Sequence, residues 1–128
     1  MPATQKTITP VDGSVYVERP YAIAQEIAAT LRAATEAQRA WKAVPVAERA
    51  KLVSKAVDIF LTHKDAVAEE ITRQMGRPIG QSPGEMRGFE ERARHMIQIA
   101  PEALADIEAT DKPGFTRFIH REPLGVVF

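Results

Sequence analysis

Three histidines, His63, His95 and His120, are the first candidates for metal binding in this sequence. Only His95 has another possible ligand at helical spacing, because Glu91 precedes it by four positions and would share its helix face. A zinc site needs four filled positions, and these two side chains do not complete one. We therefore predict no metal centre and interpret Glu91 and His95 as a solvated pair.

Cysteine is absent from the sequence, so the chain offers no thiol nucleophile, no thiolate metal ligand and no disulfide. The 17 acidic residues include many possible general acids and bases, but their spacing singles out none of them. We predict no catalytic residue within this chain.

Glycines recur at intervals of four, at Gly76, Gly80, Gly84 and Gly88. A phosphate-binding loop needs its glycines directly between a strand and a helix, and small-residue helix motifs act in apolar membrane segments. Neither context surrounds these positions. We interpret the glycines as loop and helix-start residues and predict no cofactor-binding residue here.

Basic and aromatic side chains interleave near the end of the sequence, in a pattern found on strands that bind nucleic acid. The residues are Phe115, Arg117, Phe118, Ile119, His120 and Arg121. Lys plus Arg and Asp plus Glu each number 17, which leaves no net charge to attract a phosphate backbone. We predict a strand that pairs with another protein segment, and no nucleic-acid partner.

The elements that carry these residues are predicted to be a hairpin, three helices and then strands. Asp12 and Gly13 form a strong turn signal between two β-prone runs, which favours a hairpin in residues 1–20. Apolar residues at helical spacing indicate helices throughout 21–105, with a possible break near His63.

The third helix has a recognisable start and end. Ser82, Pro83 and Glu85 have the order of a capping box, so the helix is expected to begin there. Pro101 is expected to end or kink it. From Phe115 onward the sequence is strand-like.

Membrane and secretory segments are not expected. No stretch approaches the roughly 20 apolar residues that a membrane span needs, and residues 1–10 lack the apolar core of a signal peptide. We therefore predict a cytoplasmic location and no membrane partner.

Four stretches occur in a suggestive order: PVDGSVYVER, AQRAWKAVPVAERAKL, QMGRPIGQSPGE and REPLGVV. Together they resemble the N-terminal portion of the NAD(P)-dependent aldehyde dehydrogenase family, from about residue 8 to residue 128. The resemblance implies an α/β fold in which the helices of 21–105 pack around a Rossmann-like cofactor domain. It implies that residues 106–122 form an arm joining subunits into homo-oligomers, and that 123–128 begin a core strand.

The resemblance also implies a chemistry. A cysteine thiolate attacks the aldehyde, hydride passes to NAD or NADP, and a glutamate base assists hydrolysis of the thioester. In the family these groups follow the portion matched here, and serine would not replace the thiol because its alkoxide is essentially absent at neutral pH. We therefore expect a truncated, incomplete part of the cofactor-binding domain that binds no cofactor and is inactive alone.

Two alternatives remain open. The chain could be a non-catalytic helical interaction module that pairs with full-length subunits through residues 115–122. It could instead be an independent helical bundle unrelated to dehydrogenases, which would unfold cooperatively. For the dehydrogenase interpretation, the expected partners are the missing C-terminal part of the enzyme or full-length subunits, and the parent enzyme would act on a small-molecule aldehyde.

Overall fold

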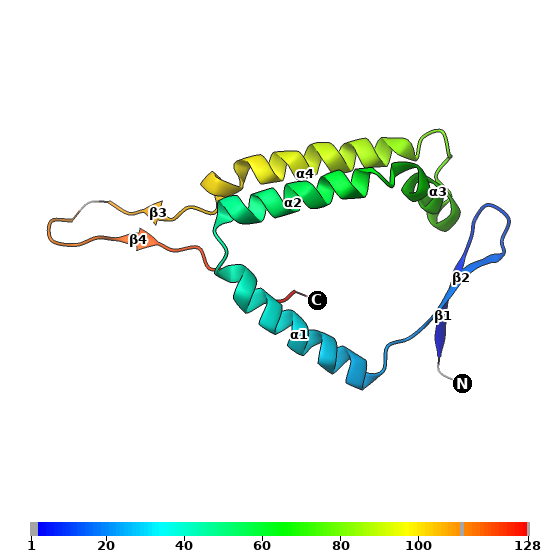
Figure 1. Cartoon of the computed structure of the whole chain (residues 1–128), viewed down its shortest axis with the longest axis horizontal. Coiled ribbons are helices and arrows are strands. Elements are labelled where there is room, and N and C mark those ends of the chain that lie inside the picture. The colour runs from blue at the N-terminus through cyan, green and yellow to red at the C-terminus, as the bar shows by residue number, and fades with distance from the viewer. Residues whose placement is uncertain (1–2, 111, 128) are drawn as a thin grey trace.

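Two short hairpins lie at opposite ends of a set of four helices (Figure 1). The computed structural model describes residues 3–110 and 112–127. In chain order the elements are β1 (Thr4–Ile8), β2 (Val15–Pro20), α1 (Ala24–Lys42), α2 (Val46–Leu61), α3 (Lys64–Met75), α4 (Pro83–Ala103), β3 (Ile107–Glu108) and β4 (Phe118–Ile119). Each strand pairs only with its neighbour in sequence, so the described residues contain no larger sheet.

The predicted N-terminal hairpin is confirmed over residues 4–20. β1 and β2 pair antiparallel with a register irregularity near Ile8. Gly13 occupies the left-handed region at φ +78°, and the Asp12 carboxylate accepts the Ser14 amide at 2.9 Å. Hydrogen bonds from Ser14 lower the pKa of Asp12, because they stabilise its charged form.

The second predicted helix divides at the possible break near His63, so the described residues form four helices where the sequence pattern predicted three. The Thr62 amide bonds to the Ile59 carbonyl at 3.1 Å and the His63 amide to the Phe60 carbonyl at 3.0 Å. The Thr62 hydroxyl also donates to the Ile59 carbonyl, at 2.7 Å. These bonds span three residues and tighten the last turn, so α2 ends and a new helix axis starts beyond His63.

α4 begins where the sequence predicts, but the capping box does not form. Ser82 has helical backbone angles and makes no side-chain cap. Its hydroxyl lies 2.9 Å from that of Thr72 and 3.3 Å from the Pro78 carbonyl. Glu85 pairs with Arg77 at 2.6 Å instead of reaching back to the helix start. Contacts between α3 and the loop before α4 have displaced the local motif.

Two further helix ends differ from the expectation. Pro101 does not end α4, which continues to Ala103. It lies in the last turn, where the missing amide removes only one of many hydrogen bonds along the helix. At α1 the Glu26 carboxylate accepts the Ile23 amide at 2.9 Å, so half of a capping box forms where none was predicted.

The buried core is small and lies where α2, α3 and α4 meet. The buried apolar residues of the described chain are Val57, Ala68 and Met86, one from each helix. α2 and α4 run side by side (Figure 1), with the Phe60 and Phe89 rings edge to face at 4.9 Å between centroids. α1 stands apart from this pair and has no buried residue.

Regular strand is shorter near the end of the chain than the sequence pattern indicates. Only Phe118–Ile119 forms a strand after Phe115, and residues 120–127 have no strand pairing. Gly125 has φ +99°, outside the strand region, and Phe128 lies outside the described residues. A strand is defined by hydrogen bonds to a neighbour, so a core strand over 123–128 stays a prediction about a larger sheet.

Candidate functional site

Residues 106–110 and 112–122 lie in a narrow hairpin, here called the arm, that projects from the end of α4 (Figure 1). β3 and β4 pair antiparallel, with Ile107 opposite Ile119 and Glu108 opposite Phe118. The Ala109 amide extends the ladder by bonding to a carbonyl on the opposite side at 3.2 Å. All six candidate residues predicted from the sequence therefore lie in this one hairpin.

The apolar candidates expose their side chains along the arm. Phe115, Phe118 and Ile119 are 65%, 54% and 60% exposed. Near the tip, the Lys112 ammonium lies 4.9 Å from the centre of the Phe115 ring, at a distance typical of a cation–π contact. Exposing two phenylalanines and an isoleucine on a short hairpin is unfavourable in free energy, because water hydrates apolar surface poorly. Such a surface is typical of one that another protein surface covers.

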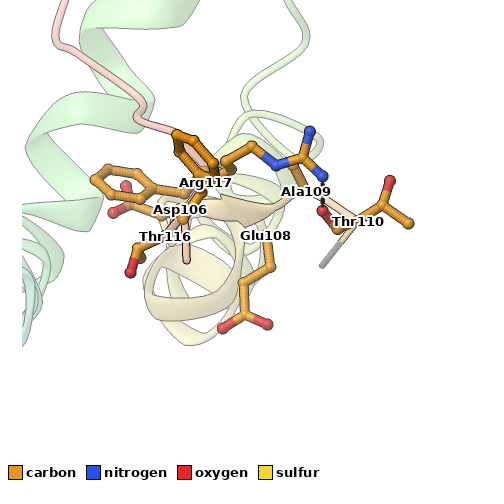
Figure 2. A pocket seen from close by; sticks show the side chains of 8 residues that line it. Asp106, Glu108, Ala109, Thr110, Thr116 and Arg117 are labelled. Atoms are coloured by element: carbon orange, nitrogen blue, oxygen red, sulfur yellow. Dashed lines mark hydrogen bonds between the residues drawn. The ribbon is translucent and has the colours of Figure 1, made fainter. Parts of the chain in front are cut away.

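Arg117 holds the shape of the hairpin. Its guanidinium donates to the Thr110 carbonyl across the arm, as the stick view shows (Figure 2). The two sides enclose a hollow of about 350 Å³. Its lining residues are Asp106, Glu108, Ala109, Thr110, Phe115, Thr116, Arg117 and Phe118. The carboxylate of Glu108 points away from Arg117 in this view, so the hollow does not gather acid and base groups around one point.

Ionisable side chains meet at the base of the arm. The His120 ring places Nδ1 2.5 Å from the Asp106 carboxylate and Nε2 3.3 Å from that of Glu122. Glu122 also pairs with Lys42, the last residue of α1. The Lys42 ammonium, followed by the His120 charge, lowers the pKa of Glu122 by favouring its carboxylate.

Sequence reasoning selected His120 but missed its partners. Asp106, Glu122 and Lys42 belong to three separate stretches of sequence, and no spacing rule relates them. The sixth candidate, Arg121, donates to the Ala103 carbonyl at the end of α4. This bond satisfies one of the free carbonyls that every helix end leaves, and it anchors the returning side of the arm.

The described residues offer no ready site for a metal or a dinucleotide. Within residues 3–110 and 112–127, no three or more His, Asp or Glu side chains are placed so that they could hold one metal ion. Gly76 ends α3 in the left-handed region, whereas Gly84 and Gly88 lie inside α4. None of these follows a strand, so the residues do not fit a phosphate-binding turn. Within the same ranges, no helix is both long enough and apolar enough to cross a bilayer.

The sequence is similar to known enzymes along nearly all of its length. The model of the "Aldehyde dehydrogenase family" matches residues 2–128. Malonate-semialdehyde dehydrogenase 1 of Bacillus licheniformis is 27% identical over 129 residues, covering 97% of this chain and 26% of that protein. The mitochondrial succinate-semialdehyde dehydrogenase of Mus musculus is 32% identical over 108 residues, covering 79% of this chain and 19% of that protein. The chain thus spans about a quarter or less of the relatives it matches.

Solved structures have the same arrangement of elements. PnpE, whose structure is known in complex with nicotinamide adenine dinucleotide, superposes with a TM-score of 0.84 at 25% identity, over 95% of this chain and 25% of that chain. Another structure of PnpE, from Pseudomonas sp. WBC-3, gives a TM-score of 0.83. A benzaldehyde dehydrogenase from Corynebacterium glutamicum shares the fold, with a TM-score of 0.75 at 24% identity.

Proposed function

This chain belongs to the aldehyde dehydrogenase family, and from that premise we propose that it forms the N-terminal part of an enzyme that oxidises an aldehyde to a carboxylic acid with NAD or NADP. The observation that carries the proposal is the family match over residues 2–128, supported by a fold shared with PnpE over 95% of the chain. A semialdehyde is the substrate class we favour, because the relatives from Bacillus licheniformis and Mus musculus are named for semialdehydes.

The role that we assign to the helices is to pack against the rest of the cofactor domain. A mainly apolar hollow of about 250 Å³ lies where the end of α1 meets α2 and α4, and Trp41, Val53 and Met96 line it. The Nε hydrogen of Arg49, in the same wall, is buried without a hydrogen-bond partner. A buried donor and an open apolar surface both favour a covering segment that supplies carbonyl oxygens and apolar side chains.

The role that we assign to the arm is to join subunits. Its exposed apolar residues and its projection away from the helices support this proposal (Figure 1). Phe115, Phe118 and Ile119 would pack against a second subunit, while Arg117, His120 and Arg121 hold the hairpin in shape. The same features favour the second candidate function, an interaction module that pairs with full-length subunits without catalysis.

The 128-residue chain alone is proposed to be inactive. It contains no cysteine, and the family reaction begins with a cysteine thiolate. NAD or NADP would accept hydride in the complete enzyme, and we propose that this chain alone does not bind that cofactor. A cytoplasmic location stays a prediction from the sequence.

Complementation tests the enzymatic proposal. The chain is co-expressed with the Bacillus licheniformis relative from which the matching quarter has been deleted, and malonate semialdehyde oxidation is followed by NADH absorbance. We expect turnover only when both pieces are present. Turnover by the cysteine-free chain alone would contradict its assigned inactivity. Co-purification of the two pieces without turnover would support the interaction module instead.

A matched pair of substitutions tests the packing surface. Met96→Glu places a charge in the wall of the apolar hollow, whereas Met75→Glu places one on an α3 side chain that is 77% exposed. Met96 is 58% exposed in this chain, so the substitution matters only where the proposed covering segment packs. We expect Met96→Glu to reduce reconstituted activity at least tenfold, because a charge covered by that segment would lose its hydration. Met75→Glu is expected to leave the activity within about twofold of the unmodified chain. Equal activities would show that the hollow is not the packing surface.

A further inference from the structure

The turn between β1 and β2 contains Asp12, the one aspartate of this sequence that is followed by glycine. The other aspartates, Asp58, Asp65, Asp106 and Asp111, precede isoleucine, alanine, isoleucine and lysine. Gly13 has φ +78°, a conformation that favours glycine, so the turn depends on this residue type. Glycine has no side chain to shield its amide nitrogen from the neighbouring carboxyl group. The turn therefore requires the dipeptide in which these two groups are least hindered.

The reaction open to this dipeptide is the closure of a succinimide ring. The Gly13 nitrogen attacks Cγ of the protonated Asp12 carboxyl group, a C–N bond forms, and the carboxyl hydroxyl leaves with the amide hydrogen as water. A second water molecule then opens the ring. Its addition at Cγ restores aspartate, whereas its addition at the main-chain carbonyl carbon gives isoaspartate, in which the chain runs through the former side chain. One water leaves and one is added, so the mass of the chain does not change.

The folded turn keeps both reacting groups in unreactive states. The Gly13 amide donates to the Thr9 carbonyl at 2.9 Å. The Asp12 carboxylate accepts the Ser14 amide at 2.9 Å, and hydrogen bonds from Ser14 lower the pKa of this carboxyl group. The charged carboxylate lacks the hydroxyl that must leave. Ring closure therefore requires these hydrogen bonds to break.

Contacts around the turn help to keep it closed. Thr9, which is 3% exposed, also donates its amide to the Ser14 carbonyl at 2.9 Å. Pro10 lies so close to the end of α3 that a Cβ added to Gly76 would be 2.8 Å from Pro10 Cγ. Further along the hairpin, Tyr16 on β2 donates to a carboxylate of α3 at 2.5 Å. Opening of the turn is therefore coupled to release of the hairpin from α3.

We propose that Asp12 and Gly13 are a site of spontaneous isoaspartate formation, which the closed turn suppresses and which opening of the hairpin permits. Isoaspartate adds one methylene to the backbone between Thr9 and Ser14, whose hydrogen bonds close the turn. The modification therefore weakens the closed turn and favours the released hairpin. This inference is independent of the proposed enzymatic role, because every group in the reaction belongs to this chain or is water.

The first experiment compares the folded and the unfolded full chain. Both are incubated in the same mildly acidic buffer, without and with guanidinium chloride, and then digested with trypsin. Asp12 is the one aspartate of tryptic peptide 7–32, and electron-transfer fragmentation distinguishes its isoaspartate form. We expect isoaspartate to accumulate at least about tenfold faster in the unfolded chain. Equal rates would overturn the protection by the turn, and no isoaspartate in either sample would overturn the site.

An aspartate elsewhere in the same samples is the matched control for the dipeptide. Asp58 is the one aspartate of tryptic peptide 56–64, and the isoleucine after it shields the attacking nitrogen. In denaturant we expect Asp58 to isomerise at least about tenfold more slowly than Asp12, because only Asp12 precedes an unshielded amide. Equal rates would show that Asp12 is not a special site and would overturn the proposal.

A pair of tyrosine variants tests the coupling to hairpin release. Tyr16→Phe removes the bond to α3 and is expected to raise the rate at Asp12 about twofold to fivefold in buffer. Tyr21→Phe, just beyond β2, is the control and is expected to match the unmodified chain. In denaturant all three chains should react at one rate. The coupling fails if the two variants agree in buffer, or if Tyr16→Phe is also faster in denaturant. Far-UV circular dichroism checks that the helices persist.

Discussion

Tyr16 on β2 donates its phenolic hydrogen to the Glu70 carboxylate on α3, with 2.5 Å between the two oxygens. Gln74 donates to the other Glu70 oxygen at 2.6 Å, and the Arg73 guanidinium lies 5.7 Å from the centre of the Tyr16 ring. The bond raises the pKa of Tyr16 and lowers the pKa of Glu70, since it favours the neutral phenol and the charged carboxylate. The bond connects the N-terminal hairpin to α3, between residues that are 54 positions apart in the sequence.

Replacing the phenol should loosen the hairpin without unfolding the helices. In Tyr16→Phe the hydroxyl is lost and the ring remains, so the tie to Glu70 disappears while the apolar contact stays. We expect amide hydrogens in β1 and β2 to exchange about twofold to fivefold faster. Tyr21→Phe, at an exposed position just beyond β2, is the control and should exchange at the unmodified rate. Equal rates in both variants would show that the bond does not restrain the hairpin.

The same tie should weaken in acid. In the folded chain the pKa of Glu70 is lowered from 4.5. The stabilisation from the Tyr16–Glu70 hydrogen bond is therefore fully present above pH 4.5, and it is lost as the pH falls through the lower pKa of the folded chain. The exchange difference between the unmodified chain and Tyr16→Phe should therefore persist at neutral pH and vanish in strong acid. Amide exchange corrected for its intrinsic pH dependence measures this. A difference that stays constant into strong acid would contradict the role of the carboxylate.

Gly76 should not tolerate a side chain. Its φ of +77° is disfavoured for other residues, and an added Cβ would lie 2.8 Å from Pro10 Cγ in the hairpin turn. We expect Gly76→Ala to reduce the free energy of unfolding by about 1–2 kcal/mol, measured by urea titration of the full chain. Gly80→Ala meets nothing within 4 Å and is the control, expected to change it by less than about 0.5 kcal/mol. Equal losses would mean that the contact with the hairpin is unimportant.

Met86 should contribute much more to stability than an exposed methionine. It is 4% exposed and belongs to the small core between α2, α3 and α4, whereas Met75 is 77% exposed. Truncating a buried methionine removes apolar contacts and leaves a cavity, so Met86→Ala should cost about 2–4 kcal/mol of unfolding free energy. Met75→Ala should cost less than about 0.5 kcal/mol. Thermal or urea unfolding compares them, and similar midpoints would show that this core does not stabilise the isolated chain.

Ser82 should be energetically coupled to Thr72. Their hydroxyl oxygens are 2.9 Å apart, and Ser82 is fully buried. We expect Ser82→Ala and Thr72→Val each to destabilise the chain by about 1 kcal/mol. The double variant should lose less than the sum, with a coupling of about 0.5–1.5 kcal/mol. Additive losses in this double-mutant cycle would mean that each hydroxyl finds another partner.

Short-range signals in the sequence predicted much of the fold. The turn at Asp12 and Gly13, the helical stretch of α1 and the start of α4 follow from spacing and turn residues within a few positions. The order of four short motifs was enough to indicate the family, which the match over residues 2–128 confirms. The six arm residues were selected in the same way, and their role in joining subunits stays a prediction.

Local patterns failed where a distant group competed for the same atom. The Ser82 hydroxyl matched a capping box, but it bonds to Thr72 because α3 brings that hydroxyl within reach. The division at His63 depends on where α2 and α3 pack, and the extended run after Phe115 lacks a neighbouring strand beyond Ile119.

The sequence by itself determined the helical stretches and the first hairpin turn, because propensity and periodicity act between residues a few positions apart, and the order of its four motifs indicated the family. Only the tertiary structure decided which charges meet. Tyr16 with Glu70, and Lys42 with Glu122 and His120, are pairs and clusters that close across long sequence separations. Their hydrogen bonds depend on distances of a few ångströms between folded elements, and no residue spacing along the chain encodes those distances.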